Sequence, residues 1–215
     1  MCGVIGIISK NVLAHEDISN LLVQSKIRGQ HATGISYVQD DVIKTSIIPK
    51  NAEYIKLQNV HTKTLIGHAR YSTSSLEYNQ PISYLDVSIV HNGVITQENS
   101  ANWGKFNYDF QTANDSEFIL KSYLEGKHPV KEYEEASISS VILDNNTGEV
   151  HFFRNEKRPL YYAETANTYY IASTKNILIR SGYDNITKCD SCYNYTIKNN
   201  KLKKYKIRNT FEDLQ

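Results

Sequence analysis

Short runs of apolar residues, separated by polar turns, dominate the hydrophobic pattern of this chain. Gly3–Ser9 is short, apolar and β-branched, which is typical of a buried strand. Two extended runs meet at Asp40 and Asp41, and this arrangement predicts a hairpin. The pattern predicts further strands, so that the full set covers residues 3–9, 33–38, 41–48, 65–68, 87–95, 137–143, 149–154, 160–163, 168–172, 193–198 and 202–207.

Apolar residues at helical spacing are less common in the chain than short continuous apolar runs. Ile18, Leu21 and Leu22 recur at the spacing of one helical face, and we expect helices over residues 15–27, 51–58, 116–124 and 175–179. Repeats, low-complexity linkers and domain boundaries are not evident, so residues 1–215 are expected to form one domain. Because strands outnumber helices, the pattern favours a layered α+β fold.

Composition narrows the class of protein. The 215 residues can bury one sizeable core, and 24 basic against 23 acidic residues do not indicate a nucleic-acid surface. Three cysteines are too few for a disulfide framework and favour a reducing compartment. The first ten residues lack the pattern of a secretion signal, and apolar runs are too short to span a membrane. We therefore expect a cytoplasmic location without membrane or nucleic-acid partners.

The first residues, MCGVIGI, place a thiol where only one removable residue precedes it. If Met1 is removed, Cys2 carries both a thiol and an α-amine, with ordinary pKa values of about 8.5 and about 8. The amine can then act as the base that activates the thiol, while Gly3 allows the backbone to approach the reacting centre. Taken alone, this signal is weak, because a cysteine at this position is more often a small buried apolar residue.

Five short segments follow one another along the chain: MCGVIGI at 1–7, RGQHATGI at 28–35, GHARYST at 67–73, HNGVI at 91–95 and NDSE at 114–117. Their order and spacing resemble the glutaminase domain of the class II glutamine amidotransferases, which are N-terminal-nucleophile hydrolases. Two of them, GHARYST and RGQ…GI, look most like the glutaminase domain of amidophosphoribosyltransferase. The resemblance covers roughly residues 2–180, and NQPI at 79–82 also fits it.

The resemblance implies a four-layer αββα sandwich that hydrolyses the side-chain amide of L-glutamine, without a metal or an organic cofactor. Cys2 would be the nucleophile, and Asn92 and Gly93 would form the oxyanion hole, with His91 beside them as a supporting residue. The side chain of Asn92 and the backbone of Gly93 both offer N–H donors to a developing oxyanion. The alternative for the same residues is an ordinary Asn-Gly turn at a strand end.

Substrate selection needs one fixed cation and one fixed anion, because free glutamine carries a carboxylate and an ammonium group. The resemblance assigns Arg70 to the carboxylate, Asp115 to the ammonium and a hydroxyl contact to Thr73, while Arg28 would brace the nucleophile. A planar guanidinium suits a carboxylate because it donates two parallel hydrogen bonds. Without the resemblance, Arg70 and Asp115 would each be interpreted as a solvated surface charge or as half of a weak ion pair.

The chain also departs from the family pattern. His31 stands where an aspartate is usual, Ser74 and Ser75 replace a more typical pair, and the stretch 124–138 is short, so a flanking helix is expected to be reduced. A synthase domain is not recognisable, and we expect a separate synthase or acceptor-binding partner to receive the ammonia. Two alternatives stay open, namely an amidohydrolase of another γ-glutamyl compound and a catalytically idle domain that binds an amino acid.

Overall fold

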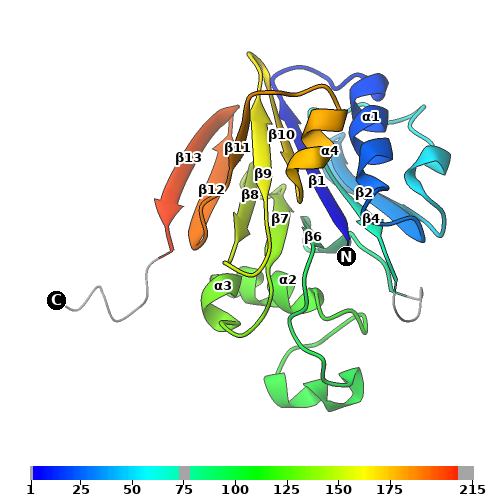
Figure 1. Cartoon of the computed structure of the whole chain (residues 1–215). Coiled ribbons are helices and arrows are strands. Elements are labelled where there is room, and N and C mark those ends of the chain that lie inside the picture. Colours follow the sequence, from blue (N-terminus) through cyan, green and yellow to red (C-terminus); the bar gives the residue numbers. More distant parts are fainter. Residues whose placement is uncertain (1, 73–77, 208–215) are drawn as a thin grey trace.

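The computed structural model describes residues 2–72 and 78–207, and two antiparallel β-sheets stack face to face at its centre (Figure 1). The 7-stranded sheet has the order β11-β9-β10-β1-β4-β2-β3, and the 6-stranded sheet has the order β13-β12-β8-β7-β6-β5. The strands of the first sheet are β1 (Gly3–Ser9), β2 (Ala32–Gln39), β3 (Val42–Ile48), β4 (Thr64–Arg70), β9 (Tyr161–Glu164), β10 (Thr168–Ala172) and β11 (Ile186–Lys188). Those of the second are β5 (Ile82–Tyr84), β6 (Val87–His91), β7 (Ser139–Asp144), β8 (Glu149–Arg154), β12 (Tyr193–Lys198) and β13 (Lys201–Lys206).

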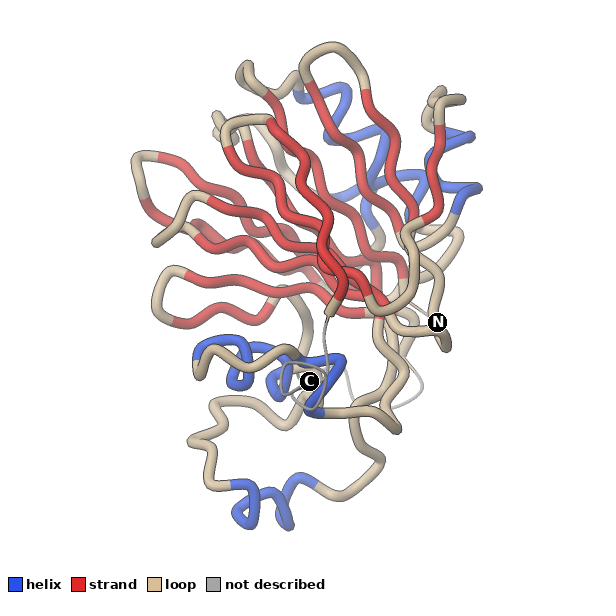
Figure 2. The backbone as a smooth tube through the Cα atoms, turned by 90° about the vertical axis from the view of Figure 1, so that its left-hand side faces the viewer, coloured by secondary structure: helices blue, strands red, loops and turns tan. Residues whose placement is uncertain are grey.

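Helices cover the outer faces of both sheets (Figure 2). The helix α1 (His15–Ser25) and the helix α4 (Lys175–Arg180) pack on the first sheet, with the 3₁₀ turn η1 (Ala52–Tyr54) beside them. The helix α2 (Glu117–Leu124) and the short helix α3 (Pro129–Glu132) pack on the second sheet, and the 3₁₀ segment η2 (Ser100–Phe106) precedes them in the chain. Within the described residues, no helix is both long and apolar enough to cross a membrane.

Three hydrophobic clusters separate four layers. One lies between α1, α4 and the first sheet, and includes Leu21 and Leu65. A second fills the space between the two sheets, and a third lies between the second sheet and α2. Two helical layers therefore enclose two sheets, which confirms the predicted four-layer αββα sandwich.

The central strand β1 shows why the pattern of apolar residues led to this fold. Ile5 and Ile7 point into the helical cluster, whereas Val4 and Ile8 point between the sheets. Alternate side chains of a strand point to opposite faces, so a strand buried on both faces must be apolar throughout. The continuous apolar run in the sequence follows from this double burial.

The structure differs from the sequence expectations at a few elements. The strand expected over 87–95 ends at His91, because Asn92 and Gly93 turn the chain and only Val94 makes a further bridge, to Ser137. The helix expected over 51–58 is reduced to η1. The elements β5, η2, α3 and β11 were not expected, because each is short and has no clear period.

Candidate active site

Cys2 lies directly before β1, at the end of the sandwich where β6 also ends. Its backbone nitrogen donates a hydrogen bond to Oδ1 of Asn92 at 3.2 Å, and its Sγ lies 3.9 Å from the carbonyl oxygen of Tyr71. These residues are far apart in the chain, so the stacking of the two sheets brings them together. The first residue, Met1, lies outside the described residues.

The turn Asn92–Gly93 is fixed by the neighbouring strand β7. The amide of Asn92 donates to the carbonyl of Ser139 at 2.8 Å, and that of Val94 donates to the carbonyl of Ser137 at 3.1 Å. A Cβ at Gly93 would lie 1.7 Å from the Ser137 oxygen, so glycine is required there. The Nδ2 atom of Asn92 is buried and has no partner among the described residues. An unused N–H donor therefore lies in the same amide group that contacts Cys2.

His91 is a buried structural residue of this turn. Its Nε2 lies 3.1 Å from the carbonyl oxygen of Ser137, which can only accept, so Nε2 carries the proton. Its Nδ1 lies 2.9 Å from the hydroxyl of Ser116 and accepts from it. Burial lowers the pKa of His91, although the carboxylate of Asp115 acts in the opposite direction. The ring is therefore held neutral, in one tautomer.

Two arginines lie near the thiol. Arg70, at the end of β4, donates to Oδ1 of Asn79 at 2.7 Å and to the carbonyl of Tyr78. Arg28 follows α1, in a turn that packs tightly because a Cβ at Gly29 would lie 2.2 Å from the Arg70 backbone. Burial lowers the pKa of both guanidinium groups, and the charge of Cys2 opposes this shift without cancelling it.

Gly3 and Asp115 occupy two further positions around the nucleophile. A Cβ at Gly3 would lie 2.9 Å from the carbonyl oxygen of Ser25 and 3.2 Å from Cβ of Arg28, so glycine permits this contact. The half-buried carboxylate of Asp115 accepts the amides of Ile95 at 2.6 Å and Thr96 at 3.2 Å through Oδ2. Asp115 thereby ties the segment after the turn to the start of α2.

One cavity of about 700 Å³ collects most of the predicted site residues. Of these, Cys2, Arg70, His91, Gly93 and Asp115 line it. Asn92 does not line the cavity itself but accepts a hydrogen bond from the nitrogen of Cys2, which does, and Gly3 and Arg28 pack behind the nucleophile. The predicted contact Thr73 lies outside the described residues, as do Ser74 and Ser75.

The segment 28–35 departs from the family pattern at His31, and the structure gives this residue a local role. The backbone amide of Ser72 donates to Nδ1 of His31 at 2.9 Å. The His31 ring also packs against Tyr71, with ring centroids 5.1 Å apart. His31 therefore holds the chain that follows β4 against the start of β2.

Sequence reasoning missed several residues that the cavity contains. Gln80 is buried and bonds the backbone of His91, and the motif NQPI was recognised without a role for it. His68 is fully enclosed, and its Nε2 has no partner among the described residues. Burial, helped by the charge of Arg70, lowers the pKa of His68 to about 3, so this ring is also neutral.

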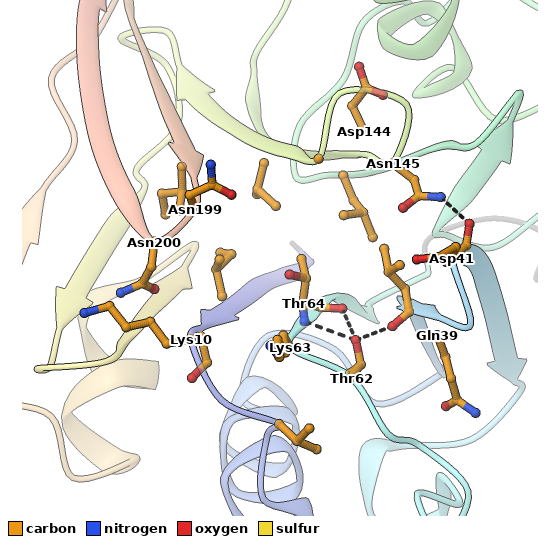
Figure 3. A pocket seen from close by; sticks show the side chains of 18 of the residues that line it. Lys10, Gln39, Asp41, Thr62, Lys63, Thr64, Asp144, Asn145, Asn199 and Asn200 are labelled. Carbon is orange, nitrogen blue, oxygen red and sulfur yellow. Dashed lines mark hydrogen bonds between the residues drawn. The ribbon is translucent and has the colours of Figure 1, made fainter.

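A second hollow, of about 640 Å³, lies at the opposite end of the sandwich (Figure 3). The seven-residue strand β1 begins directly after Cys2 and ends at Ser9, which lines this hollow, so the two residues lie about 23 Å apart at roughly 3.3 Å per residue. Its rim already bonds within the protein, since Asn145 donates to the carbonyl of Asp41 and Thr62 to that of Val38. No predicted site residue that the structure describes lines it.

Metal ligands do not gather in the part of the chain that the structure describes. No group of three His, Cys, Asp or Glu side chains lies close enough there to hold a metal ion. The pair Cys189 and Cys192 are both free thiols, and Cys189 is fully buried.

Comparisons with solved structures identify the fold. The glutamine phosphoribosylpyrophosphate amidotransferase from B. subtilis, complexed with ADP and GMP, matches 96% of this chain with a TM-score of 0.79 and 20% identity. An allosteric regulatory enzyme of purine biosynthesis matches 96% with a TM-score of 0.81 and 20% identity. This chain covers 49% of each of those two chains, so it spans about half their length.

A glutamine aminotransferase class-II domain protein from Silicibacter pomeroyi also matches. That match covers 97% of this chain and 100% of the other, with a TM-score of 0.60 and 9% identity. A search of curated proteins found no match. A family model described as a glutamine amidotransferase domain matches residues 56–214. The chain therefore belongs to the glutamine amidotransferase domain family, with the N-terminal-nucleophile fold of its class II members.

Proposed function

We propose that this protein hydrolyses the side-chain amide of L-glutamine, with Cys2 as the nucleophile. One observation carries the proposal. The amide of Asn92 accepts from the nitrogen of Cys2 through Oδ1, while its Nδ2 is buried and has no partner among the described residues. A buried polar atom without a partner is costly, and a ligand that accepts a hydrogen bond removes that cost.

The first half of the reaction forms a thioester. After removal of Met1, the α-amine of Cys2 takes the thiol proton, and sulfur attacks the amide carbon of the substrate. The carbonyl oxygen becomes an oxyanion that accepts from Nδ2 of Asn92 and the backbone amide of Gly93. The carbon–nitrogen bond then breaks, and the amine returns the proton to the leaving ammonia.

Water completes the cycle. It attacks the thioester carbon and gives a proton to the α-amine, and the same two donors hold the second oxyanion. The carbon–sulfur bond breaks, glutamate leaves, and the thiolate of Cys2 recovers its proton. Apart from water and the substrate, every group in this cycle belongs to Cys2, Asn92 or Gly93.

Recognition of the amino-acid head rests on two side chains of opposite charge in one cavity. Arg70 suits the substrate carboxylate, because a guanidinium donates two parallel bonds, and Asp115 suits the ammonium group. Oδ2 of Asp115 already accepts two backbone amides, so the ammonium group would approach Oδ1. The residue Thr73 is proposed to add a hydroxyl contact.

The ammonia is proposed to pass to a synthase activity on a partner protein or domain. A glutaminase that acts alone wastes its product, so we expect a low rate in this protein until the acceptor site is engaged. A reducing compartment such as the cytoplasm would keep the nucleophilic thiol free.

The test is the release of ammonia from glutamine by the purified protein, compared with the release of amines from γ-glutamyl conjugates. We expect glutamine to be hydrolysed, and the variant Cys2→Ala to be inactive. Preference for the conjugates would instead support an amidohydrolase of another γ-glutamyl compound. Absence of both activities in protein that has lost Met1 would contradict the proposal.

A further inference from the structure

Gln80 continues the β5–β6 ladder with its side chain. In that ladder Ile82 pairs with Ile89 and Ser83 with Ser88, so the same register puts Gln80 opposite His91. Pro81 has no N–H, so it cannot donate to the ladder. The side-chain amide of Gln80 instead exchanges both bonds with the backbone of His91, which donates to Oε1 at 2.6 Å and accepts from Nε2 at 3.2 Å.

The same amide also reaches the opposite wall of the site. Nε2 of Gln80 donates to the hydroxyl of Ser116 at 3.0 Å, and that hydroxyl in turn donates to Nδ1 of His91. Gln80 is only 6% exposed, so these bonds are made away from water. His91 is therefore held through its backbone by Gln80 and through its ring by Ser116.

The backbone of residues 78–80 also packs closely against β2. A Cβ at Gly34 would lie 2.1 Å from the carbonyl oxygen of Gln80 and 2.7 Å from Cδ of Pro81, so the glycine of β2 makes room for it. The segment also contacts the two walls that hold the proposed substrate groups. The carbonyl of Tyr78 accepts from Arg70 and from Nδ2 of Asn114.

We infer that Gln80 is a positioning residue for the oxyanion turn, an inference that rests on the proposed function. His91 immediately precedes Asn92 and Gly93, and oxyanion donors work only when held within about 0.5 Å of the productive position. Neither Oε1 nor Nε2 of Gln80 needs to contact the substrate. Its contribution is to fix the strand end from which both donors project.

The test compares two reactions of Cys2 in the variant Gln80→Met, which keeps the length of the side chain and loses its donor and acceptor. Glutamine hydrolysis needs the oxyanion hole. Alkylation by iodoacetamide does not, because sulfur displaces iodide at a saturated carbon. We expect kcat to fall by about 10²-fold or more, as for loss of one oxyanion donor, with KM and the rate of Cys2 alkylation unchanged. Mass spectrometry assigns the label to Cys2 and separates it from Cys192.

Ser140→Ala is the matched control. The hydroxyl of Ser140 donates to the carbonyl of Val90 at 2.8 Å, so this variant also loses a buried hydrogen bond to β6. The lost bond is to Val90, the residue before His91, and not to His91 itself. We expect this variant to lose stability and to keep kcat. If Gln80→Met does not fold, Gln80→Glu keeps the acceptor and loses the donor, and the same split between hydrolysis and alkylation is expected.

Amide hydrogen exchange of Asn92 and Val94 separates this inference from the proposed function. Their amides bond to the neighbouring strand, so they report the position of the turn without any substrate. Faster exchange in the Gln80 variant than in Ser140→Ala supports the inference even if the wild-type protein does not hydrolyse glutamine. Unchanged exchange, unchanged kcat, or an equal loss of hydrolysis and alkylation would overturn it.

Discussion

The nitrogen of Cys2 lies 3.2 Å from Oδ1 of Asn92, and Nδ2 of the same amide is buried without a partner among the described residues. One side chain therefore contacts the proposed base and also presents a free donor beside the proposed nucleophile. If the proposal is right, the thiol of Cys2 and Nδ2 of Asn92 act on the same substrate carbonyl.

Replacing Asn92 by aspartate tests the free donor. The variant Asn92→Asp keeps an acceptor for the nitrogen of Cys2 and loses both Nδ2 protons. We expect kcat for glutamine to fall by about 10²–10³-fold or more, because an oxyanion donor is lost and a negative charge is added. Steady-state kinetics measure this effect.

Asn20→Asp serves as the control for that change. Nδ2 of Asn20 donates to the carbonyl of Ser181 at 3.0 Å, between α1 and α4 and away from the cavity. We expect this variant to lose stability and retain kcat. Equal kcat in Asn92→Asp and wild type would remove Asn92 from the oxyanion hole.

Gly93→Ala tests the close approach of the turn to β7. The added methyl group would lie 1.7 Å from the Ser137 oxygen, so the turn has to move away from its position. We expect thermal unfolding to show a loss of stability of about 1–3 kcal/mol, with a large fall in kcat. Gly104→Ala is the matched change, since a Cβ there meets nothing within 4 Å. Comparable kcat values in these two variants would contradict the predicted role of Gly93.

Arg70→Lys tests recognition of the substrate carboxylate. Lysine keeps the charge and loses the planar fork, so the second hydrogen bond is lost. A hydrogen bond to a charged group contributes about 1.5–3 kcal/mol, which corresponds to a fall in kcat/KM of about 10–100-fold. Arg180→Lys, in which an exposed bond to Gln24 is changed, should behave like wild type. An unchanged kcat/KM in Arg70→Lys would mean that the carboxylate binds elsewhere.

Buried histidines predict loss of stability in acid. Burial lowers the pKa of His68 to about 3 and that of His128 to about 4, both from 6.5. The unfolded chain therefore binds more protons below pH 6.5, and the free energy of unfolding falls as the pH drops from 6.5 towards 4. Each such histidine contributes up to about 1.4 kcal/mol per pH unit.

Urea unfolding at several pH values measures this dependence. His128→Asn keeps an acceptor for the amide of Val130 at the start of α3 and removes one titrating ring. We expect its stability to depend less on pH between 6.5 and 4 than that of wild type. The same slope in both proteins would show that His128 protonates freely in the folded state.

Most strands could be predicted from the sequence because buried strand positions are apolar and therefore visible in the hydrophobic pattern. The strand β1 is apolar throughout since both its faces are covered, and the turn Asp40–Asp41 marks a hairpin. Prediction failed where apolar residues continue past the end of an element. Val94 and Ile95 look like further strand, yet Asn92 and Gly93 turn the chain away from the ladder.

The site residues were predicted from short motifs, and the structure brings those it describes to one end of the sandwich. The supporting contacts were not predictable in the same way. The side chain of Gln80 bonds to the backbone of His91 where a strand residue would use its own backbone. The spacing of apolar residues along the chain cannot predict such a bond. The burial of His68 and the hydroxyl relay through Ser116 likewise arise only when β4, β6 and α2 pack together.

Mass spectrometry of the protein after treatment with a glutamine-like diazo-ketone tests most directly whether Cys2 supplies both the nucleophile and its base. We predict an intact mass that lacks Met1 and a single label, located on Cys2. A retained Met1, or a label on another residue, would contradict the proposed mechanism. In either case the thiol and the α-amine of Cys2 could not together serve as the nucleophile and its base.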